Sequence, residues 1–256
     1  MSAPTDRVDR FAGYDIVLTS RSLEKGEVLR GCSNYAQTPV DASNIPTRGR
    51  AVPEARPDYR GKRAFDVAVA LLALVFTAPL WPWIALAIRT ETRGPALYRT
   101  ARVGRGGTPF TLLKFRSMRA GVSGPGVTAG SDSRITRTGR LLRKSKLDEL
   151  PQFINVLRGE MSLVGPRPED ERYLPFYSDE ELAVLSVRPG ITGAAAVAYR
   201  HEETLLSRAD DVETVYRTEV LPAKLALEID YLEQRSLAVD LRLLVQTALA
   251  VGRRAT

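Results

Sequence analysis

The chain has 256 residues, 44% of them hydrophobic and 26% charged, which is enough for one substantial core and excludes the composition of a disordered chain. The formal net charge of +7 predicts an anionic partner: nucleic acid, an anionic membrane surface or a phosphorylated substrate. Because Cys32 is the only cysteine and His201 the only histidine, an intramolecular disulfide and a Cys/His metal cluster are excluded, and any metal would take oxygen ligands. The first residues lack the apolar run of a secretory signal, so we expect a cytoplasmic protein or one on the cytoplasmic face of a membrane.

Residues 1–59 predict a leader followed by a proline-rich linker. One strand-like run, residues 14–19, precedes a polar segment that contains Pro39, Pro46, Pro53 and Pro57. A small docking element for a partner is the alternative, but no residue pattern here indicates chemistry.

Residues 67–88 carry no charge, and this length is that of a membrane helix. Pro79 and Pro82 interrupt it, and Pro79 removes a backbone donor where a spanning helix needs continuity. The arm from Ala64 to Ala78 would be only about 22 Å long at about 1.5 Å per residue, against about 30 Å of hydrocarbon. Basic residues flank both ends, which favours leaving both ends on the cytoplasmic side.

These features predict a re-entrant membrane helix over residues 60–93, which enters the bilayer, turns at Pro79 and leaves on the same side. The hydroxyl of Thr77 is expected to bond a carbonyl that the proline frees. An ordinary spanning anchor and a buried core helix remain alternatives.

After Gly94 the chain predicts two short strands joined by a Gly-rich turn at residues 104–107. Strand alternation would place Lys114 and Arg116 on one face, where both cations can approach a phosphate; a solvated basic strand is the alternative. Residues 120–133 lack apolar periodicity and predict a mobile loop.

The adjacent carboxylates Asp148 and Glu149 follow a basic run that contains Arg143 and Lys146. Thr138 is expected to cap the helix before them. Neighbouring residues on a helix point about 100° apart, so the two carboxylates suit separate roles better than joint chelation. One would be a nucleophile toward phosphorus and the other a ligand of a divalent cation. A capping pair on a charged surface helix is the alternative.

Several ordered blocks give the chain from about residue 60 to 251 a resemblance to the bacterial sugar transferases, the monotopic polyprenyl-phosphate phosphoglycosyl transferases. The blocks are Lys62-Arg63-Ala64-Phe65-Asp66, Gly94-Pro95, Arg102-Val103-Gly104, Lys114-Phe115-Arg116-Ser117-Met118, Leu147-Asp148-Glu149-Leu150-Pro151-Gln152, residues 155–169 with Gly165-Pro166-Arg167-Pro168, and Arg188-Pro189-Gly190-Ile191-Thr192-Gly193.

The resemblance implies transfer of a sugar 1-phosphate from a UDP-sugar to a polyprenyl phosphate such as undecaprenyl phosphate, with release of UMP, as the first membrane step of surface glycan assembly. It implies that Asp148 is the nucleophile that forms a covalent phosphosugar intermediate and that Glu149 binds Mg²⁺. Arg167 would bind substrate phosphate, with Lys114, Arg116, Arg143 and Lys146 as further candidates by charge and position. The location implied is the cytoplasmic face of the bacterial inner membrane.

The expected fold is therefore α/β and mostly helical, with short strands: a small membrane-associated catalytic domain, residues 94–256, behind the re-entrant helix. A homodimer is possible. A non-catalytic membrane adaptor that binds anionic lipid or a partner protein is the alternative function. Nucleic acid is not expected as a partner, because aromatic residues make up only 7% of the chain and no reading helix is recognisable.

Three departures from the family pattern limit the transfer of detail. Ala78 replaces the serine that often precedes the helix-breaking proline. Residues 194–200 lack the glutamine and glycine usual after Gly193, so family sugar preferences should not be carried over. Longer relatives have spanning helices ahead of the catalytic part, and no other stretch of this chain is apolar enough to span.

Two C-terminal helices, residues 224–232 and 238–251, are expected on either side of a cap at Ser236. The second has an apolar stripe that contains Leu241, Val245 and Leu249. Core packing is the favoured use of this stripe, and shallow membrane insertion is the alternative. His201, between charged neighbours, is expected to be solvated.

Overall fold

The computed structural model describes residues 9–11, 14–16, 54–119, 132–207 and 209–255. The chain forms two compact units, Met1–Asp41 and Ala42–Thr256. Two predicted segments, most of the linker and the loop after residue 119, lie outside the described residues. In the first unit, β1 (Asp9–Phe11) pairs antiparallel with β2 (Tyr14–Ile16), where the strand-like run was predicted.

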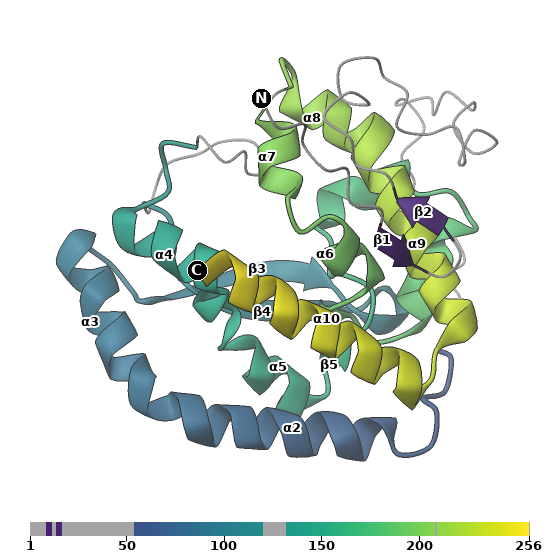
Figure 1. The fold of residues 1–256 in the computed structure, drawn as a ribbon, viewed down its shortest axis with the longest axis horizontal. Helices are drawn as coiled ribbons and strands as arrows, with labels where there is room; N and C mark the ends of the chain where they lie inside the picture. Colours follow the sequence, from purple (N-terminus) through teal and green to yellow (C-terminus); the bar gives the residue numbers. More distant parts are fainter. Residues whose placement is uncertain (1–8, 12–13, 17–53, 120–131, 208, 256) are drawn as a thin grey trace, which may run out of the picture. The chain divides into compact units, whose positions relative to one another are not determined.

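Helices predominate in the described part of the second unit, as the sequence predicts (Figure 1). Its α-helices are α2 (Lys62–Thr77), α3 (Trp81–Glu91), α4 (Arg137–Ser145), α5 (Gln152–Arg158), α6 (Ala194–Ala198), α7 (Glu202–Leu206), α8 (Val212–Val215), α9 (Leu221–Gln234) and α10 (Leu237–Ala255). Its strands are β3 (Leu97–Val103), β4 (Pro109–Phe115), β5 (Ser162–Val164) and β6 (Gly190–Thr192). Short 3₁₀ segments are η1 (Ala78–Leu80), η2 (Arg105–Gly107), η3 (Leu147–Glu149), η4 (Glu171–Phe176) and η5 (Glu181–Ser186), and η6 (Tyr216–Val220) is a π-helix.

The predicted helix break at Pro79 is confirmed. α2 ends at Thr77, one 3₁₀ turn follows, and α3 leaves in a different direction (Figure 1). The expected role of Thr77 is wrong in detail, because its Oγ1 donates to the carbonyl of Ala73 at 2.7 Å. Pro79 lacks the N–H that would have bonded Val75, four residues before it, so the hydroxyl reinforces the turn preceding the break.

The outer face of the broken helix is apolar and exposed. Phe76 is 77% exposed and Trp83 71% exposed, and the further exposed residues are Leu71, Leu72, Val75, Leu80 and Leu86. The run Lys62–Glu91 is long and apolar enough to cross a membrane, and only 11% of its most apolar window is buried within the protein. This exposure excludes the buried core helix that the sequence left open.

Buried ionic contacts hold the start of α2 against the rest of its unit. The Nζ of Lys62 lies 3.1 Å from Asp66 and 2.6 Å from Asp240 on α10. The guanidinium of Arg63 donates to the carbonyls of Val156 and Leu157 at the end of α5. Breaking a buried ion pair is costly, because the remaining partner is left as an uncompensated charge. These contacts therefore hold the first turn of α2 in place and fix the direction of its axis.

The predicted hairpin is also confirmed. β3 and β4 pair antiparallel around the turn at Gly104–Thr108, where Gly106 has a φ of 68° that suits glycine. Phe115 of this hairpin packs in one cluster with buried residues of α3 and α4, and it contacts Trp81 edge to face with ring centroids 5.4 Å apart. The hairpin therefore joins the broken helix to the part of the chain that carries Asp148.

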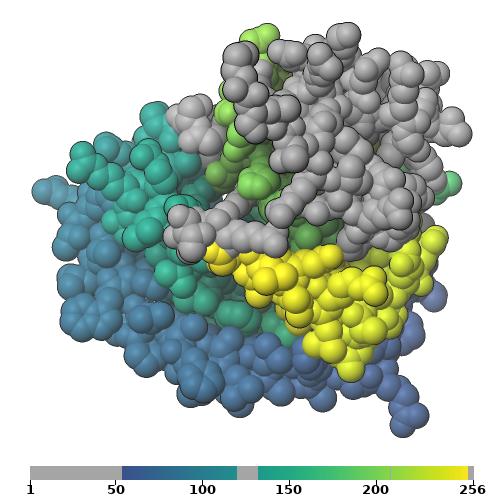
Figure 2. All heavy atoms as spheres, viewed as in Figure 1, coloured from purple at the N-terminus to yellow at the C-terminus, as the bar shows by residue number. Residues whose placement is uncertain are grey.

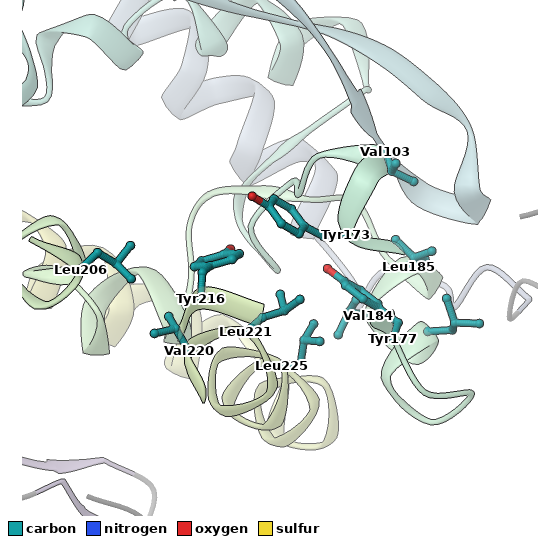
Figure 3. Close-up of a cluster of buried hydrophobic side chains, with 11 residues drawn as sticks. Val103, Tyr173, Tyr177, Val184, Leu185, Leu206, Tyr216, Val220, Leu221 and Leu225 are labelled. Atoms are coloured by element: carbon teal, nitrogen blue, oxygen red, sulfur yellow. The ribbon is translucent and has the colours of Figure 1, made fainter. Parts of the chain in front are cut away.

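A second buried cluster links η4 and η5 to α9 (Figure 3). Tyr173, Tyr177, Tyr216, Leu221 and Leu225 form its centre. The 3₁₀ segment η5, Glu181–Ser186, contributes Leu182, Val184 and Leu185 to this cluster. Ser236 accepts from the backbone N–H of Val239 at 3.4 Å, which confirms the predicted cap between α9 and α10.

The favoured interpretation of the α10 stripe is wrong. Leu241, Val245 and Leu249 lie on the surface, and Val245 is 58% exposed. Figure 2 shows α10, in yellow, at the surface of the molecule in this view. Leu243, which has no exposed surface, lies on the face of α10 that packs inward. Helical periodicity finds an apolar stripe without saying which side faces the core, because a stripe can equally cover the protein or remain on its surface.

Close backbone approach shapes the loop that follows β5. β5 pairs in parallel with β6, and a Cβ at Gly190 would lie 2.2 Å from the backbone nitrogen of Gly165. Only glycine fits there, so the Gly165-Pro166-Arg167-Pro168 loop is held against the Arg188-Pro189-Gly190 turn.

Candidate active site

Asp148 lies in a tight turn between two helices. α4 ends at Ser145. The next residue, Lys146, caps the helix with a φ of 59° in the left-handed region, and the 3₁₀ turn Leu147–Glu149 follows. The cap of α4 is Thr136, whose hydroxyl accepts from the backbone N–H of Gly139, so the assignment to Thr138 is wrong. The first two backbone N–H groups of α4, those of Arg137 and Thr138, donate to the carboxylate of Glu91 on α3.

The carboxyl of Asp148 is buried and incompletely bonded. The residue is 6% exposed, and within the described part of the chain its Oδ1 has no hydrogen-bond partner. Burial raises its pKa, and the charge of Glu149 raises it further, while Lys114, Lys146 and Arg143 oppose the shift. A buried carboxyl with an unused oxygen is costly to maintain in a folded protein and is typical of a group that meets a ligand.

Glu149 is held by two cations. Its Oε1 lies 3.6 Å from the Nζ of Lys114 and 3.5 Å from that of Lys146. Burial alone would raise its pKa, but Lys146, Lys114 and Arg167 lower the pKa to about 2. The adjacent carboxyls therefore differ: Glu149 is firmly ionised, whereas Asp148 has a raised pKa. This contrast agrees with separate roles for the pair.

A cleft of about 1520 Å³ opens beside Asp148. Most of the predicted site residues line it: Asp148, Lys114, Arg116, Arg143 and Arg167. Glu149 and Lys146 adjoin this wall through the contacts with Lys114 rather than lining it. One end of the cleft is formed by the helix break and α3, with Ala78, Trp81, Pro82 and Ala85. The break and the carboxylate thus share one continuous space.

Arg116 and Arg143, like Lys114 and Lys146, have protein partners. The guanidinium of Arg116 donates to the carbonyls of Thr92 and Arg93 at 2.8 Å each, at the end of α3, and more weakly to Gly94. Arg143 forms an ion pair with Glu203. Arg116 thus fixes the end of the broken helix beside the cleft, and its binding to phosphate stays a prediction.

A further polar cluster on the wall of the cleft was not predicted. Lys224, which is 3% exposed, lies 3.2 Å from Glu169, 3.4 Å from Glu202 and 3.1 Å from the hydroxyl of Tyr216. All four residues line the cleft. They come from three separate segments and form no motif, so only the folded chain shows that they meet.

Arg167 connects this cluster to the carboxylate pair. Desolvation favours the neutral form of its guanidinium, but the charges of Glu149, Glu169 and Glu202 outweigh it and raise the pKa of Arg167. Glu149 is beside Asp148, and the other two carboxylates belong to the Lys224 cluster. The charge of Arg167 therefore interacts with both groups of carboxylates.

Glu228 on α9 is also buried. It is 3% exposed, and its carboxyl accepts from the backbone N–H of Ala195 at 3.2 Å. Burial raises its pKa to about 8, so the carboxyl is mostly protonated at neutral pH. Sequence reasoning missed it because it lies within an ordinary amphipathic helix.

Glu228→Gln should alter the pH dependence of stability. The native carboxyl keeps its proton up to about pH 8, while the unfolded one loses it near its ordinary value of 4.5, so wild-type stability falls as pH rises between these values. The variant lacks this fall and should gain up to about 4 kcal/mol relative to wild type between pH 4.5 and pH 8.5. Denaturant unfolding at both pH values measures it. Exposed Glu233→Gln is the control, and parallel pH curves for Glu228→Gln and wild type would contradict the prediction.

Asp148 and Glu149 fit a Mg²⁺ ion that takes its other ligands from substrate phosphates and water. Among the described residues no group of three His, Cys, Asp or Glu side chains forms a metal cage. Mg²⁺ is usually held by one or two carboxylates together with substrate phosphates and water, and an ionised Glu149 next to an unpartnered Asp148 oxygen matches that donor set.

Comparison with known proteins finds several similar chains. The chain is 43% identical to the UDP-glucose:undecaprenyl-phosphate glucose-1-phosphate transferase of Caulobacter vibrioides, over 78% of this chain and 72% of that protein. It is 37% identical to the Xanthomonas campestris protein of the same name, over 96% of this chain and 49% of that protein. It is 35% identical to an Aeromonas hydrophila UDP-N-acetylgalactosamine-undecaprenyl-phosphate N-acetylgalactosaminephosphotransferase, over 73% of this chain and 42% of that protein.

The last two relatives are more than twice as long as the part that this chain matches, and the three names include two different sugars. The sequence model of one protein family, described as bacterial sugar transferase, matches residues 58–254, which include the broken helix, the carboxylate pair and the Arg167 loop. The chain therefore belongs to the bacterial sugar transferase family.

Proposed function

We propose that the protein transfers a sugar 1-phosphate from a UDP-sugar to undecaprenyl phosphate, giving undecaprenyl-diphosphate-sugar and UMP, as the first membrane step of surface glycan assembly. The names of the relatives support this reaction. The observation that carries it is the buried Asp148 carboxyl, which has an unpartnered oxygen in a cleft lined by Lys114, Arg143 and Arg167. An adaptor that only holds anionic lipid has no use for such a carboxylate.

In the first step an Asp148 oxygen attacks the sugar-bearing phosphorus of the UDP-sugar. A new bond forms between this oxygen and phosphorus, the bond from phosphorus to the bridging oxygen breaks, and UMP leaves with the electron pair. Arg167 and Lys114 stabilise the negative charge of the phosphate oxygens during the displacement. The attacking carboxyl must be ionised, and the cations around it favour that form.

In the second step a phosphate oxygen of the lipid attacks the phosphorus of the aspartyl phosphosugar. The bond to Asp148 breaks, the carboxylate is regenerated and a diphosphate is formed. The apolar end of the cleft, with Trp81 and Pro82, suits the first isoprene units of the lipid. Covalent catalysis divides the transfer into two displacements, so both substrates can use one phosphate site in turn.

Mg²⁺ held by Glu149 and substrate phosphates would neutralise the charge of the diphosphate. Lys114 and Lys146 keep Glu149 ionised and oriented for this role.

The broken helix places the cleft at a membrane surface in this proposal. Its exposed apolar face enters the bilayer, and the break returns the chain to the side from which it came, which is the cytoplasmic face of the inner membrane. Because the break lines the cleft, the same turn brings the cleft to the depth at which the lipid phosphate lies.

The test is an assay of UMP release by the purified full chain in lipid nanodiscs. With a suitable UDP-sugar we expect release in stoichiometric amounts without acceptor, and many turnovers when undecaprenyl phosphate and Mg²⁺ are present. EDTA should stop turnover. No UMP from any of a panel of UDP-sugars would contradict the proposed function.

A further inference from the structure

The Lys224 cluster differs from a surface ion pair, because its cation is buried and has several partners. Lys224 is buried on α9, and it contacts two carboxylates and a tyrosine hydroxyl that all line the cleft. Burying an ammonium group is costly unless it is paired and hydrogen-bonded, and here it is both. The contacts hold Glu169 and Glu202 in fixed positions, because each is tied to the same rigid cation.

The position of the cluster follows from Arg167. The pKa of this arginine responds to the charges of Glu149, Glu169 and Glu202, and the last two carboxylates line the same cleft as Arg167. In the proposed reaction Arg167 contacts the attacked phosphate. The sugar is bonded to that same phosphorus, so its hydroxyl groups must lie within a few ångströms of Arg167 and away from the line that joins Asp148 to the leaving UMP.

The chemistry of the cluster suits a sugar better than the other parts of the substrates. The isoprenoid needs apolar walls, which lie at the helix break, and the diphosphate needs cations, which lie around Asp148. Carboxylates would repel both phosphates. They are strong acceptors for sugar hydroxyl and amide N–H groups, and Lys224 offsets their charge.

The backbone supports a binding role for this part of the cleft. Tyr216 begins η6, a π-helix between α8 and α9, and such segments occur frequently at functional sites. The Tyr216 ring lies beside Tyr173, with centroids 5.0 Å apart, and both residues line the cleft (Figure 3). The cluster therefore combines carboxylate acceptors with two largely buried tyrosines that reach the cleft, and a few placed polar groups beside aromatic residues are common in small-molecule sites.

We propose that Glu169 and Glu202 bind the hydroxyl or amide groups of the transferred sugar and set sugar selectivity, and that Lys224 positions them. This assignment rests on the proposed function and identifies its specificity site. Glu202 lies shortly after residues 194–200, where the glutamine usual in the family is missing. Glu202 thus supplies a polar group to a region of the chain that has lost one.

The experiment compares kcat/KM for UMP release from UDP-glucose, UDP-galactose and their two N-acetylamino counterparts. Glu169→Gln and Glu202→Gln keep the size of the side chain and remove its charge. We expect at least one variant to lose about 10- to 100-fold with the preferred sugar and much less with another, because one charged hydrogen bond to a sugar group is lost. Inhibition by UMP, which lacks the transferred sugar, should stay within about twofold of wild type.

Glu233→Gln is the matched control, because Glu233 is exposed on the same helix as Lys224 and does not line the cleft. Both variants with wild-type selectivity would overturn the assignment and leave the proposed function intact. Equal losses with all four sugars together with weaker UMP inhibition would also overturn it, because these indicate a structural role. A wild type that releases UMP from none of the four overturns the proposed function and the assignment with it.

Discussion

Asp148→Asn should lower the rate of UMP release by at least about 10³-fold, because an amide cannot form the acyl phosphate and no other carboxylate reaches the same position. The fold should survive, since Oδ1 has no hydrogen-bond partner in the described part of the chain and Asn has nearly the same shape. Removing this buried ionisable group should raise stability, because burial disfavours the charged carboxylate.

Single-turnover quench-flow measurements with saturating UDP-sugar give the rate, and thermal unfolding checks the fold. Asp230→Asn is the control, because Asp230 lies on α9, does not line the cleft and bonds only locally to Gln234. A folded Asp148→Asn protein that keeps a tenth of wild-type turnover would rule out the nucleophile assignment.

Arg167→Gln is expected to have the second largest effect, a loss of about 10²- to 10³-fold in kcat/KM. The guanidinium belongs to a residue that lines the cleft, and its charge interacts with Glu149, Glu169 and Glu202, so its loss removes charge stabilisation from the phosphate and leaves more negative charge around it. Arg167→Lys keeps the charge and loses the planar fork, and it should recover only part of the activity.

Steady-state kinetics with both substrates measure these losses. Arg242→Gln is the control, because Arg242 is exposed on α10 and does not line the cleft. Activity of Arg167→Gln within threefold of wild type would show that Arg167 does not contact the transferred phosphate.

Local signals in the sequence were sufficient for much of the structure. Pro79 broke the apolar helix where predicted, because a missing donor acts on its own helix whatever surrounds it. The glycines at residues 104–107 formed the hairpin turn for the same local reason. The cations near Asp148 were found because they lie close in sequence or belong to a recognisable block.

What the sequence did not reveal depends on contacts between distant segments. Lys224 meets Glu169 and Glu202 only after α9 folds against the loops that follow β5 and β6, and no periodicity encodes such a meeting. The side of α10 that faces inward is decided by the ion pair of Asp240 with Lys62 and by the fit of Leu243, neither of which is visible in an apolar stripe. Arg116 looked like a phosphate ligand because its backbone acceptors come from another segment.

The central claim is that Asp148 carries the sugar phosphate between the two substrates. Intact-mass spectrometry of the protein, after incubation with UDP-sugar and Mg²⁺ and without undecaprenyl phosphate, tests it most directly. We expect the mass of the protein to increase by one sugar phosphate, with one UMP released per protein. The modified peptide should contain Asp148, and the adduct should disappear when undecaprenyl phosphate is added. Turnover with both substrates and no adduct at any time, or an adduct that persists in Asp148→Asn, would contradict it.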